Sequence, residues 1–209
     1  ISIASIVCDW AFIRRHHTNP FLPKASWPVF RGSPGLLGVA HGTLPRKPDL
    51  LWSFATSNEI KSSPVIGNGL VFIGSTDSNV YALGLADGAA RWVFTGPDAF
   101  EAPPLLVSNL VVIGSMDGTL HALDAATGKA VWQYRTGGKL LGSANSVVVG
   151  SGTRTLILAG SYDNLMHCVD AASGSSVWTF STGNYINGSP AICDGKAVFG
   201  GCDAKLRVL

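Results

Sequence analysis

The sequence predicts an all-β fold, a partial β-propeller of about four four-stranded blades. Tryptophans recur at intervals of 40, 40 and 46 residues, at Trp52, Trp92, Trp132 and Trp178. The last three each close a copy of one unit, which reads GSMDGTLHALDAATGKAVW in its middle copy. Helical periodicity is nearly absent along the chain. A fixed period of about 40 residues marks a repeat architecture, in which a unit buries its faces only against neighbouring units.

Each repeat contains short apolar or alternating segments separated by Gly, Asp and Pro, which predicts four short strands. First strands are expected at Pro64–Ile66, Pro104–Val107, Asn145–Val149 and Pro190–Cys193. Second strands are expected at Leu70–Ile73, Val111–Ile113, Leu156–Leu158 and Ala197–Phe199. Third strands are expected at Val80–Leu83, Leu120–Leu123 and Leu165–Val169. Fourth strands carry the tryptophans, at Arg91–Phe94, Val131–Tyr134 and Val177–Phe180. The chain therefore holds three complete blades and three strands of a fourth.

Aspartates and glycines mark the turns of each repeat. The aspartates that follow the second strands, each a predicted turn former, are Asp77, Asp117, Asp163 and Asp203. A second turn is centred on a glycine, which takes positive φ at little cost. These glycines are Gly88, Gly128 and Gly174.

The residues around the glycine turn are predicted to dock each blade onto the next. Asp124, Thr127 and, in the following copy, Asp170 suit hydrogen bonds to nearby backbone groups. Each tryptophan is expected to cover the turn of the neighbouring blade, and an average Trp buries about 150–250 Å². The predicted docking set therefore comprises these polar residues, the three turn glycines and the four tryptophans.

The composition argues against nucleic-acid binding and narrows the choice of acid–base chemistry. The net charge is only +2, and Arg14-Arg15 is the longest basic block, so the electrostatic footprint of a nucleic-acid-binding protein is missing. Glu59 and Glu101 are the only glutamates, and the aspartates fall largely on repeat turns. We therefore expect no nucleic-acid partner and few carboxylates for catalysis.

The cysteines and the repeat histidines have structural interpretations. Cys168 replaces an alanine of the repeat and is expected in the core. Cys193 and Cys202 flank a predicted hairpin, which leaves a disulfide open, and metal-like CxxC spacing is absent. His121 and His167 stand at equivalent repeat positions. We expect a tolerant, partly exposed strand position there, with a metal pair as the alternative.

Two domains are predicted, a leader at residues 1–26 and the repeats at residues 27–209. Ile1–Ile13 is mostly apolar but is interrupted by Asp9 and followed by two arginines and two histidines. Thirteen residues are too few to span a bilayer. The leader is therefore either the tail of a longer membrane anchor or signal segment, and so a membrane tether, or a loosely packed extension.

Three segments carry a resemblance to a known family. The string Ala122–Trp132 matches the tryptophan-docking motif of pyrroloquinoline-quinone (PQQ) type repeats at every signature position. Trp27–Gly32 and Phe199–Leu209 look like bacterial PQQ-like repeat proteins of the BamB-type outer-membrane assembly factor group. The next copy departs at Cys168 and Ser173. The resemblance covers about residues 27–209 and is strong for architecture, because the motif is a packing device.

The resemblance implies an eight-bladed ring, in some members seven-bladed, of which this chain would be the first half. In such propellers the N-terminal chain often supplies the outer strand of the last blade. Leu50–Ala55, with Trp52, is expected to be that strand, so further partners would be the remaining blades of the same ring.

Two functions are open. The first is a non-catalytic scaffold, periplasmic or membrane-anchored in the bacterial cell envelope, which binds other proteins through rim loops or strand edges and needs no cofactor. The insertion in the 46-residue repeat is the expected partner loop, with candidate residues Asn145, Ser151, Gly152 and Arg154. The alternative, by resemblance, is a PQQ- and Ca²⁺-dependent alcohol or sugar dehydrogenase whose catalytic residues lie largely outside this chain.

Overall fold

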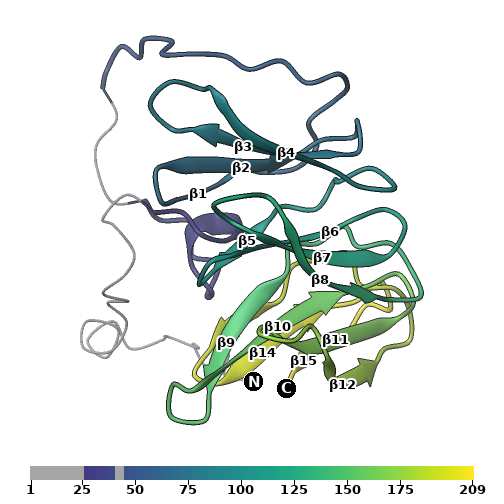
Figure 1. Cartoon of the computed structure of the whole chain (residues 1–209). Coiled ribbons are helices and arrows are strands. Elements are labelled where there is room, and N and C mark those ends of the chain that lie inside the picture. The colour runs from purple at the N-terminus through teal and green to yellow at the C-terminus, as the bar shows by residue number, and fades with distance from the viewer. Residues whose placement is uncertain (1–25, 41–44) are drawn as a thin grey trace.

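The strands form four separate antiparallel sheets that follow one another along the chain (Figure 1). The computed structural model describes residues 26–40 and 45–209, and that part of the chain contains no α-helix, only the 3-10 turn Phe30–Gly32. The predicted leader, apart from Ser26, lies outside the described residues. The all-β prediction is confirmed.

Three sheets have four strands and the last has three. The first blade contains β1 (Val65–Gly67), β2 (Leu70–Gly74), β3 (Asn79–Gly84) and β4 (Ala90–Thr95). The second contains β5 (Leu105–Val107), β6 (Leu110–Gly114), β7 (Thr119–Asp124) and β8 (Ala130–Arg135). The third contains β9 (Asn145–Val149), β10 (Arg154–Gly160), β11 (Leu165–Asp170) and β12 (Ser176–Ser181). The fourth contains β13 (Ala191–Cys193), β14 (Lys196–Gly200) and β15 (Leu206–Val208). Each blade is a simple meander.

The register repeats from blade to blade. Trp92 lies opposite Ala82, Trp132 opposite Ala122, and Trp178 opposite Cys168. Immediately after each of these pairs the register shifts by one residue, as at a β-bulge. A bulge increases local twist and re-aims the side chains beside it. Each tryptophan therefore leaves its own sheet at the same place and in the same direction.

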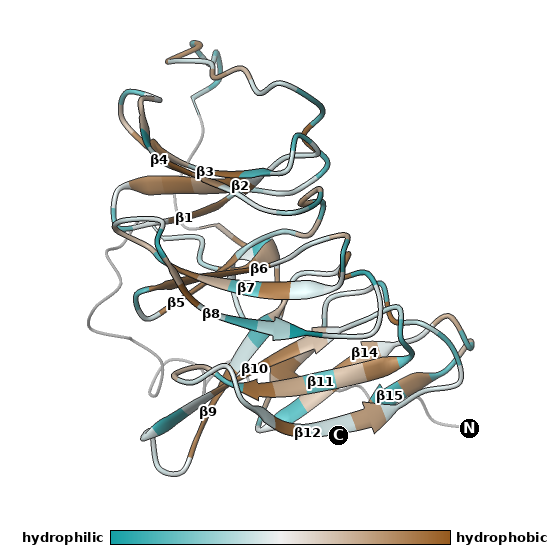
Figure 2. Ribbon diagram, turned by 45° about the vertical axis from the view of Figure 1, so that its right-hand side comes forward, coloured by the Kyte–Doolittle hydropathy of each residue, from teal (hydrophilic) through white to brown (hydrophobic). Residues whose placement is uncertain are grey.

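The apolar core lies between the blades. Phe72 and Trp92 of the first blade pack with Leu106 and Ile113 of the second in one cluster. The middle strands of the first three blades are largely buried on both faces, whereas the outer strands β8 and β12 are largely exposed. In Figure 2, β6 is coloured mainly as hydrophobic and β8 mainly as hydrophilic. Because one sheet cannot cover its own faces, neighbouring blades stabilise each other.

The N-terminal described segment, residues 26–40, crosses the innermost strands, and we call it the strap. Trp27 forms an antiparallel bridge with Ile66 of β1. Further along, the carbonyl of Pro28 accepts from the N–H of Leu106 in β5 at 2.6 Å, and the carbonyl of Pro34 accepts from Ile192 in β13 at 2.8 Å. The strap, purple in Figure 1, thus ties three blades together at their inner edges.

Within the described residues Leu50–Ala55 is not paired with another strand. The prediction gives this segment a partner in the last blade of the ring, beyond the four blades described, so it stays a prediction. Exposure nevertheless alternates along the segment, and Trp52 and Phe54 lie against the first blade. Phe54 contacts Tyr81 edge to face, with 5.2 Å between ring centroids. The segment therefore lies where the outer strand of a preceding blade would lie.

Candidate interaction surface

Three of the four repeat tryptophans contact the next blade in the same way. The indole N–H groups of Trp52, Trp92 and Trp132 donate to the carbonyls of Leu85, Ala125 and Ala171 at 3.0, 3.0 and 2.9 Å. Each ring lies against a turn glycine, so closely that a methyl group there would come within about 2.6 Å of ring carbons. The fourth ring, Trp178, is 37% exposed on β12.

The glycine turns are held by an aspartate at their start. Asp124 accepts hydrogen bonds from the N–H groups of Ala126 and Thr127 and from the Thr127 hydroxyl, at 3.2, 2.8 and 2.8 Å. These bonds, led by the hydroxyl, keep the pKa of Asp124 below its usual value. Asp170 makes the equivalent bonds in the third blade. In the first blade Gly84 replaces this aspartate, and Asp87 bonds to Ala89 and Arg91 instead.

A second aspartate in each blade pairs with the residue four positions later. The pairs are Asp77–Tyr81, Asp117–His121, Asp163–His167 and Asp203–Arg207. The expectation of partly exposed histidines is therefore wrong, since His121 is 1% and His167 is 4% exposed. Their burial follows from position, because the blade interface covers this site on the third strand.

The Asp163–His167 pair is fully hydrogen-bonded. The His167 ring lies 3.0 Å from Asp163 through Nε2 and 3.0 Å from the Tyr134 hydroxyl through Nδ1. The N–H of Gly137 also donates to Asp163, at 2.7 Å. Burial opposes ionisation of Asp163, but the Gly137 and His167 hydrogen bonds outweigh it and hold the pKa below its usual value.

The equivalent pair in the second blade lacks two of these partners. Phe94 stands where Tyr134 stands, and Pro97, which has no N–H, stands where Gly137 stands. His121 is enclosed by Phe94 and Phe100 at centroid distances of 5.5 and 5.4 Å, and its Nδ1 has no hydrogen-bond partner among the described residues. Burial lowers the pKa of His121, and Asp117 offsets this only in part.

The insertion in the third blade lengthens the hairpin of β9 and β10. Its tip, residues 150–153, is a four-residue turn, where the first two blades have two-residue turns. Ser151 and Gly152 adopt positive φ at the exposed tip, and Arg154 pairs with Asp170 at 2.7 Å. Val148, an apolar side chain, is 60% exposed. Three predicted partner residues thus lie together on a protruding hairpin.

The fourth predicted partner residue, Asn145, has another position. It is 1% exposed, at a place that Val65 and Leu105 occupy in the first two blades. Its side-chain N–H₂ donates to the carbonyls of Pro34 and Pro190 at 2.7 and 2.8 Å. The interpretation of Asn145 as a partner-contacting residue is therefore wrong, because it bonds to the strap inside the structure.

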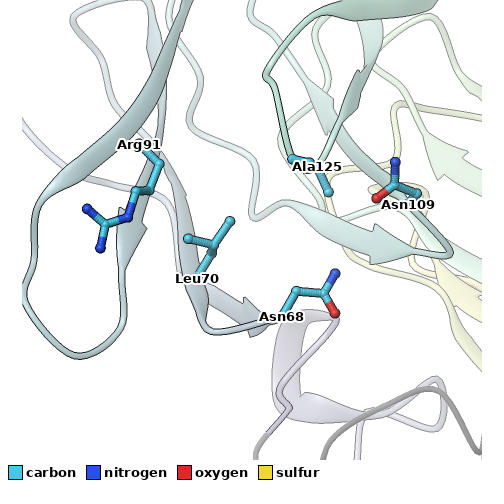
Figure 3. Close-up of a pocket in the computed structure, with 6 residues that line it drawn as sticks. Asn68, Leu70, Arg91, Asn109 and Ala125 are labelled. Carbon is cyan, nitrogen blue, oxygen red and sulfur yellow. The ribbon is translucent and has the colours of Figure 1, made fainter.

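A shallow hollow of about 300 Å³ separates the first two blades at the rim (Figure 3). Asn68, Leu70 and Arg91 line it on one side, and Asn109 and Ala125 on the other. Asn68 lies in the turn between β1 and β2, and Asn109 lies in the turn between β5 and β6. These turns are equivalent to the tip of β9–β10 in the third blade. The hollow and the tip therefore lie on one face, since antiparallel strands place these turns at the same end.

Cysteines and charged groups give no further constellation in residues 26–40 and 45–209. Cys168 is buried in the core, where desolvation raises its pKa to about 11. Cys202 is an exposed free thiol, so the disulfide with Cys193 that the sequence leaves open is not formed. Within the described residues no three His, Cys, Asp or Glu side chains gather as metal ligands do. Nor does that part of the chain contain a helix long and apolar enough to cross a membrane.

Repeated four-stranded blades joined by tryptophan and glycine contacts define a β-propeller of PQQ-like repeats. The family model described as outer membrane protein assembly factor BamB matches residues 45–154. The chain belongs to that family. No curated protein matches it.

Solved structures agree with this assignment. The crystal structure of BamB from Moraxella catarrhalis superposes with a TM-score of 0.66 and 26% identity, over 76% of this chain and 49% of that one. The chain thus spans about half the length of that protein. Quinohemoprotein alcohol dehydrogenase from Comamonas testosteroni (TM-score 0.61, 22% identity, 83% and 29% covered) is similar in fold. So is the computationally designed protein Ika4 (TM-score 0.66, 15% identity, 78% and 98% covered).

Proposed function

We propose that this chain is part of a non-catalytic propeller scaffold that binds proteins in the bacterial periplasm or cell envelope. Membership of the BamB family and the similarity to BamB from Moraxella catarrhalis support this proposal. The family is described as an outer-membrane protein assembly factor, a role that consists of contacts with other proteins.

The surface that we propose as the protein-binding site is the long β9–β10 hairpin. The hairpin extends past the turns of the other blades, carries the exposed apolar Val148, and is tied to β11 by the Arg154–Asp170 pair beside its turn. A protrusion with an exposed apolar side chain suits protein contact, whereas a packing role would bury Val148. The hairpin also presents strand edges to which a partner strand could add.

The test is to shorten the hairpin and follow its contacts. Residues 148–155 are replaced by Ser-Asn, the two-residue turn of Ser108 and Asn109 in the second blade. The new Asn can bond to Asp170 as Asn109 bonds to Asp124. The fold should persist, as judged by far-UV circular dichroism and the unfolding midpoint.

The readout is photo-crosslinking in bacterial cells that produce the chain, with the photoreactive residue at Ser151. A control carries it at Asp194, the equivalent turn of the fourth blade. We expect a discrete crosslinked protein from the Ser151 site and a weaker yield from the Asp194 site. The shortened variant no longer contains Ser151, so it carries the photoreactive residue at Ser108. This variant should no longer co-purify with the protein that the Ser151 site crosslinks. Equal yields at both sites, or unchanged co-purification, would contradict the assignment of the hairpin.

The dehydrogenase alternative has its own test. Purified chain is incubated with PQQ and Ca²⁺, and alcohol-dependent reduction of a dye is measured. Turnover above that of PQQ and Ca²⁺ without protein would overturn the scaffold proposal.

A further inference from the structure

Each blade presents one backbone N–H from its innermost strand at an equivalent position. The register aligns these positions as Ile66, Leu106, Ser146 and Ile192. Three of the four N–H groups donate to carbonyls of the strap, those of Trp27, Pro28 and Pro34, at 2.9, 2.6 and 2.8 Å. The fourth, in β9, donates to the side chain of Asn145 at 2.8 Å. An edge strand leaves such groups free to pair with another chain, and here the strap occupies them.

The strap is held mainly through its backbone. Its carbonyls accept the three bonds, and two of those carbonyls belong to prolines, which bring no N–H that would need a partner. Only Val29 is fully buried, at 1% exposure, in the cluster that contains Leu105 and Ala144. Recognition of this kind depends on where the backbone places its carbonyls and on one apolar anchor, and it tolerates other sequences around the anchor.

The rest of the strap fits its place loosely. Arg31 and Leu36 hold positive φ, at 60° and 54°, a conformation unfavourable for residues with side chains. Leu37 and Val39 are 60% and 68% exposed. A hollow of about 480 Å³ remains between the strap and β1, beside Trp27, Phe30 and Ile66. A segment with one anchor, local strain and an unfilled hollow has the features of an exchangeable ligand.

We infer that the inner edges of β1, β5 and β13 form a docking groove for a peptide that follows the path of the strap, with a turn after its apolar anchor, and that the strap occupies this groove in cis. The partner is a protein segment with a proline directly before a β-branched apolar residue, as in Pro28-Val29, which takes the place of the strap in trans. This site is separate from the β9–β10 hairpin, and the inference holds whether or not the hairpin binds a partner. Because the strap is tethered, its effective concentration at the groove is high, and it suppresses weak competitors.

The experiment measures exchange directly. A fluorescein-labelled peptide of residues 26–40, SWPVFRGSPGLLGVA, is titrated with the full 209-residue chain and followed by anisotropy. The variant Val29→Asp places a charge at the buried anchor and should release the strap in cis. The matched control, Val39→Asp, makes the same change at an exposed position of the same strap. A peptide that itself carries Val29→Asp is the negative ligand.

We expect the Val29→Asp chain to bind the peptide at least about tenfold more tightly than the wild type, because its own strap no longer competes. The Val39→Asp chain should behave as the wild type does, and the substituted peptide should bind to neither. Equal binding by wild type and Val29→Asp, or no binding by a folded Val29→Asp chain, would overturn the inference. If Val29→Asp does not fold, Val29→Ser replaces it. Unfolding of both would also overturn the inference, because the strap would then be an integral part of the core.

Discussion

His121 and His167 occupy equivalent positions of neighbouring blades, yet their buried ring nitrogens have different partners. Tyr134 lies against His167 at a centroid distance of 5.5 Å, and Phe94 lies against His121 at the same distance. At Nδ1 the two environments differ by the hydroxyl group of Tyr134, so within the described residues Nδ1 is satisfied in His167 and unpaired in His121. An unpaired buried polar atom costs about 1–3 kcal/mol, which makes this position a weak point between the first two blades.

The substitution Phe94→Tyr should repair it. The added hydroxyl can reach Nδ1 of His121 as Tyr134 reaches His167, so the free energy of unfolding should rise by about 1 kcal/mol. Urea denaturation measures the change. The reciprocal substitution, Tyr134→Phe, should lower stability by about 1–3 kcal/mol, since it leaves His167 Nδ1 unpaired. A loss of stability in both variants would show that the hydroxyl does not fit beside His121.

His121 should also make stability fall on mild acidification. Burial lowers its pKa from the usual 6.5, so the unfolded chain binds a proton more readily than the folded one. This contribution is complete above about pH 6.5 and is lost as the pH falls below that value. In the part of the chain that the structure describes, the charged group against His121 is Asp117; its neighbours Phe94 and Phe100 are neutral, and the aspartates with lowered pKa act only below about pH 4.

The variant His121→Phe isolates this effect. Unfolding free energies measured at about pH 7.5 and about pH 5.5 should differ less in the variant than in the wild type, by about 1.4 kcal/mol for each unit by which the pKa is lowered. Parallel losses in the two proteins would assign the pH dependence to another group.

At the scale of one element, the glycine turn joins two requirements in a single residue. Gly128 has φ of +72°, and a methyl group there would lie 2.6–2.7 Å from ring carbons of Trp92. Gly69, in the turn between β1 and β2, has φ of +73° but open space around it. Alanine substitutions at these two glycines therefore distinguish the cost of positive φ from the cost of contact with the Trp92 ring.

Gly69→Ala should cost about 1–2 kcal/mol of unfolding free energy, the effect of positive φ alone. Gly128→Ala should cost about 1–3 kcal/mol more, because the Trp92 ring must also move and its hydrogen bond to Ala125 is disturbed. Chemical denaturation of the two variants, with Trp fluorescence as the probe, measures the difference. Equal losses would mean that the ring contact contributes little to docking.

At the scale of the whole molecule, the blades depend on two systems of contact. On the outside, indole rings join the first sheet to the second and the second to the third, and between the sheets lie shared apolar clusters. On the inside, the strap connects the first strands of three blades, and Asn145 connects it to β9. Because the strap is remote in sequence from β13, it is the long-range element of a structure whose other contacts are local.

Most of the fold could be predicted from the sequence. Every predicted blade strand agrees with an observed one to within about two residues, since the alternation of apolar residues and the turn residues are local signals. The hairpin at residues 145–155 was likewise predictable, because an insertion in a repeat must lie in a turn. Leu50–Ala55 is predicted as the outer strand of the last blade from its resemblance to the Trp-bearing strands, and none of the described strands is the partner that this prediction requires.

The candidate site was only partly predictable, for a reason visible at Asn145. A polar residue at the start of an inserted stretch has the features of a loop residue. The sequence around Asn145 does not indicate that the strap passes beside it. The signal that could have identified it is the repeat alignment, which places Asn145 at the buried position of Val65 and Leu105. The same alignment places His121 at the position of Tyr81, a large side chain that is also buried.

The amino-acid sequence by itself determined the repeat, its strands, its turns and the spacing of the tryptophans, because period-2 alternation and turn chemistry act over a few residues. Only the tertiary structure decided which polar groups meet: the strap with the inner strands, Asn145 with Pro34, and His121 with two phenylalanines. Those pairings join residues that lie from about twenty to more than 150 positions apart in the chain, and burial, which sets their energies, exists only once the blades are assembled.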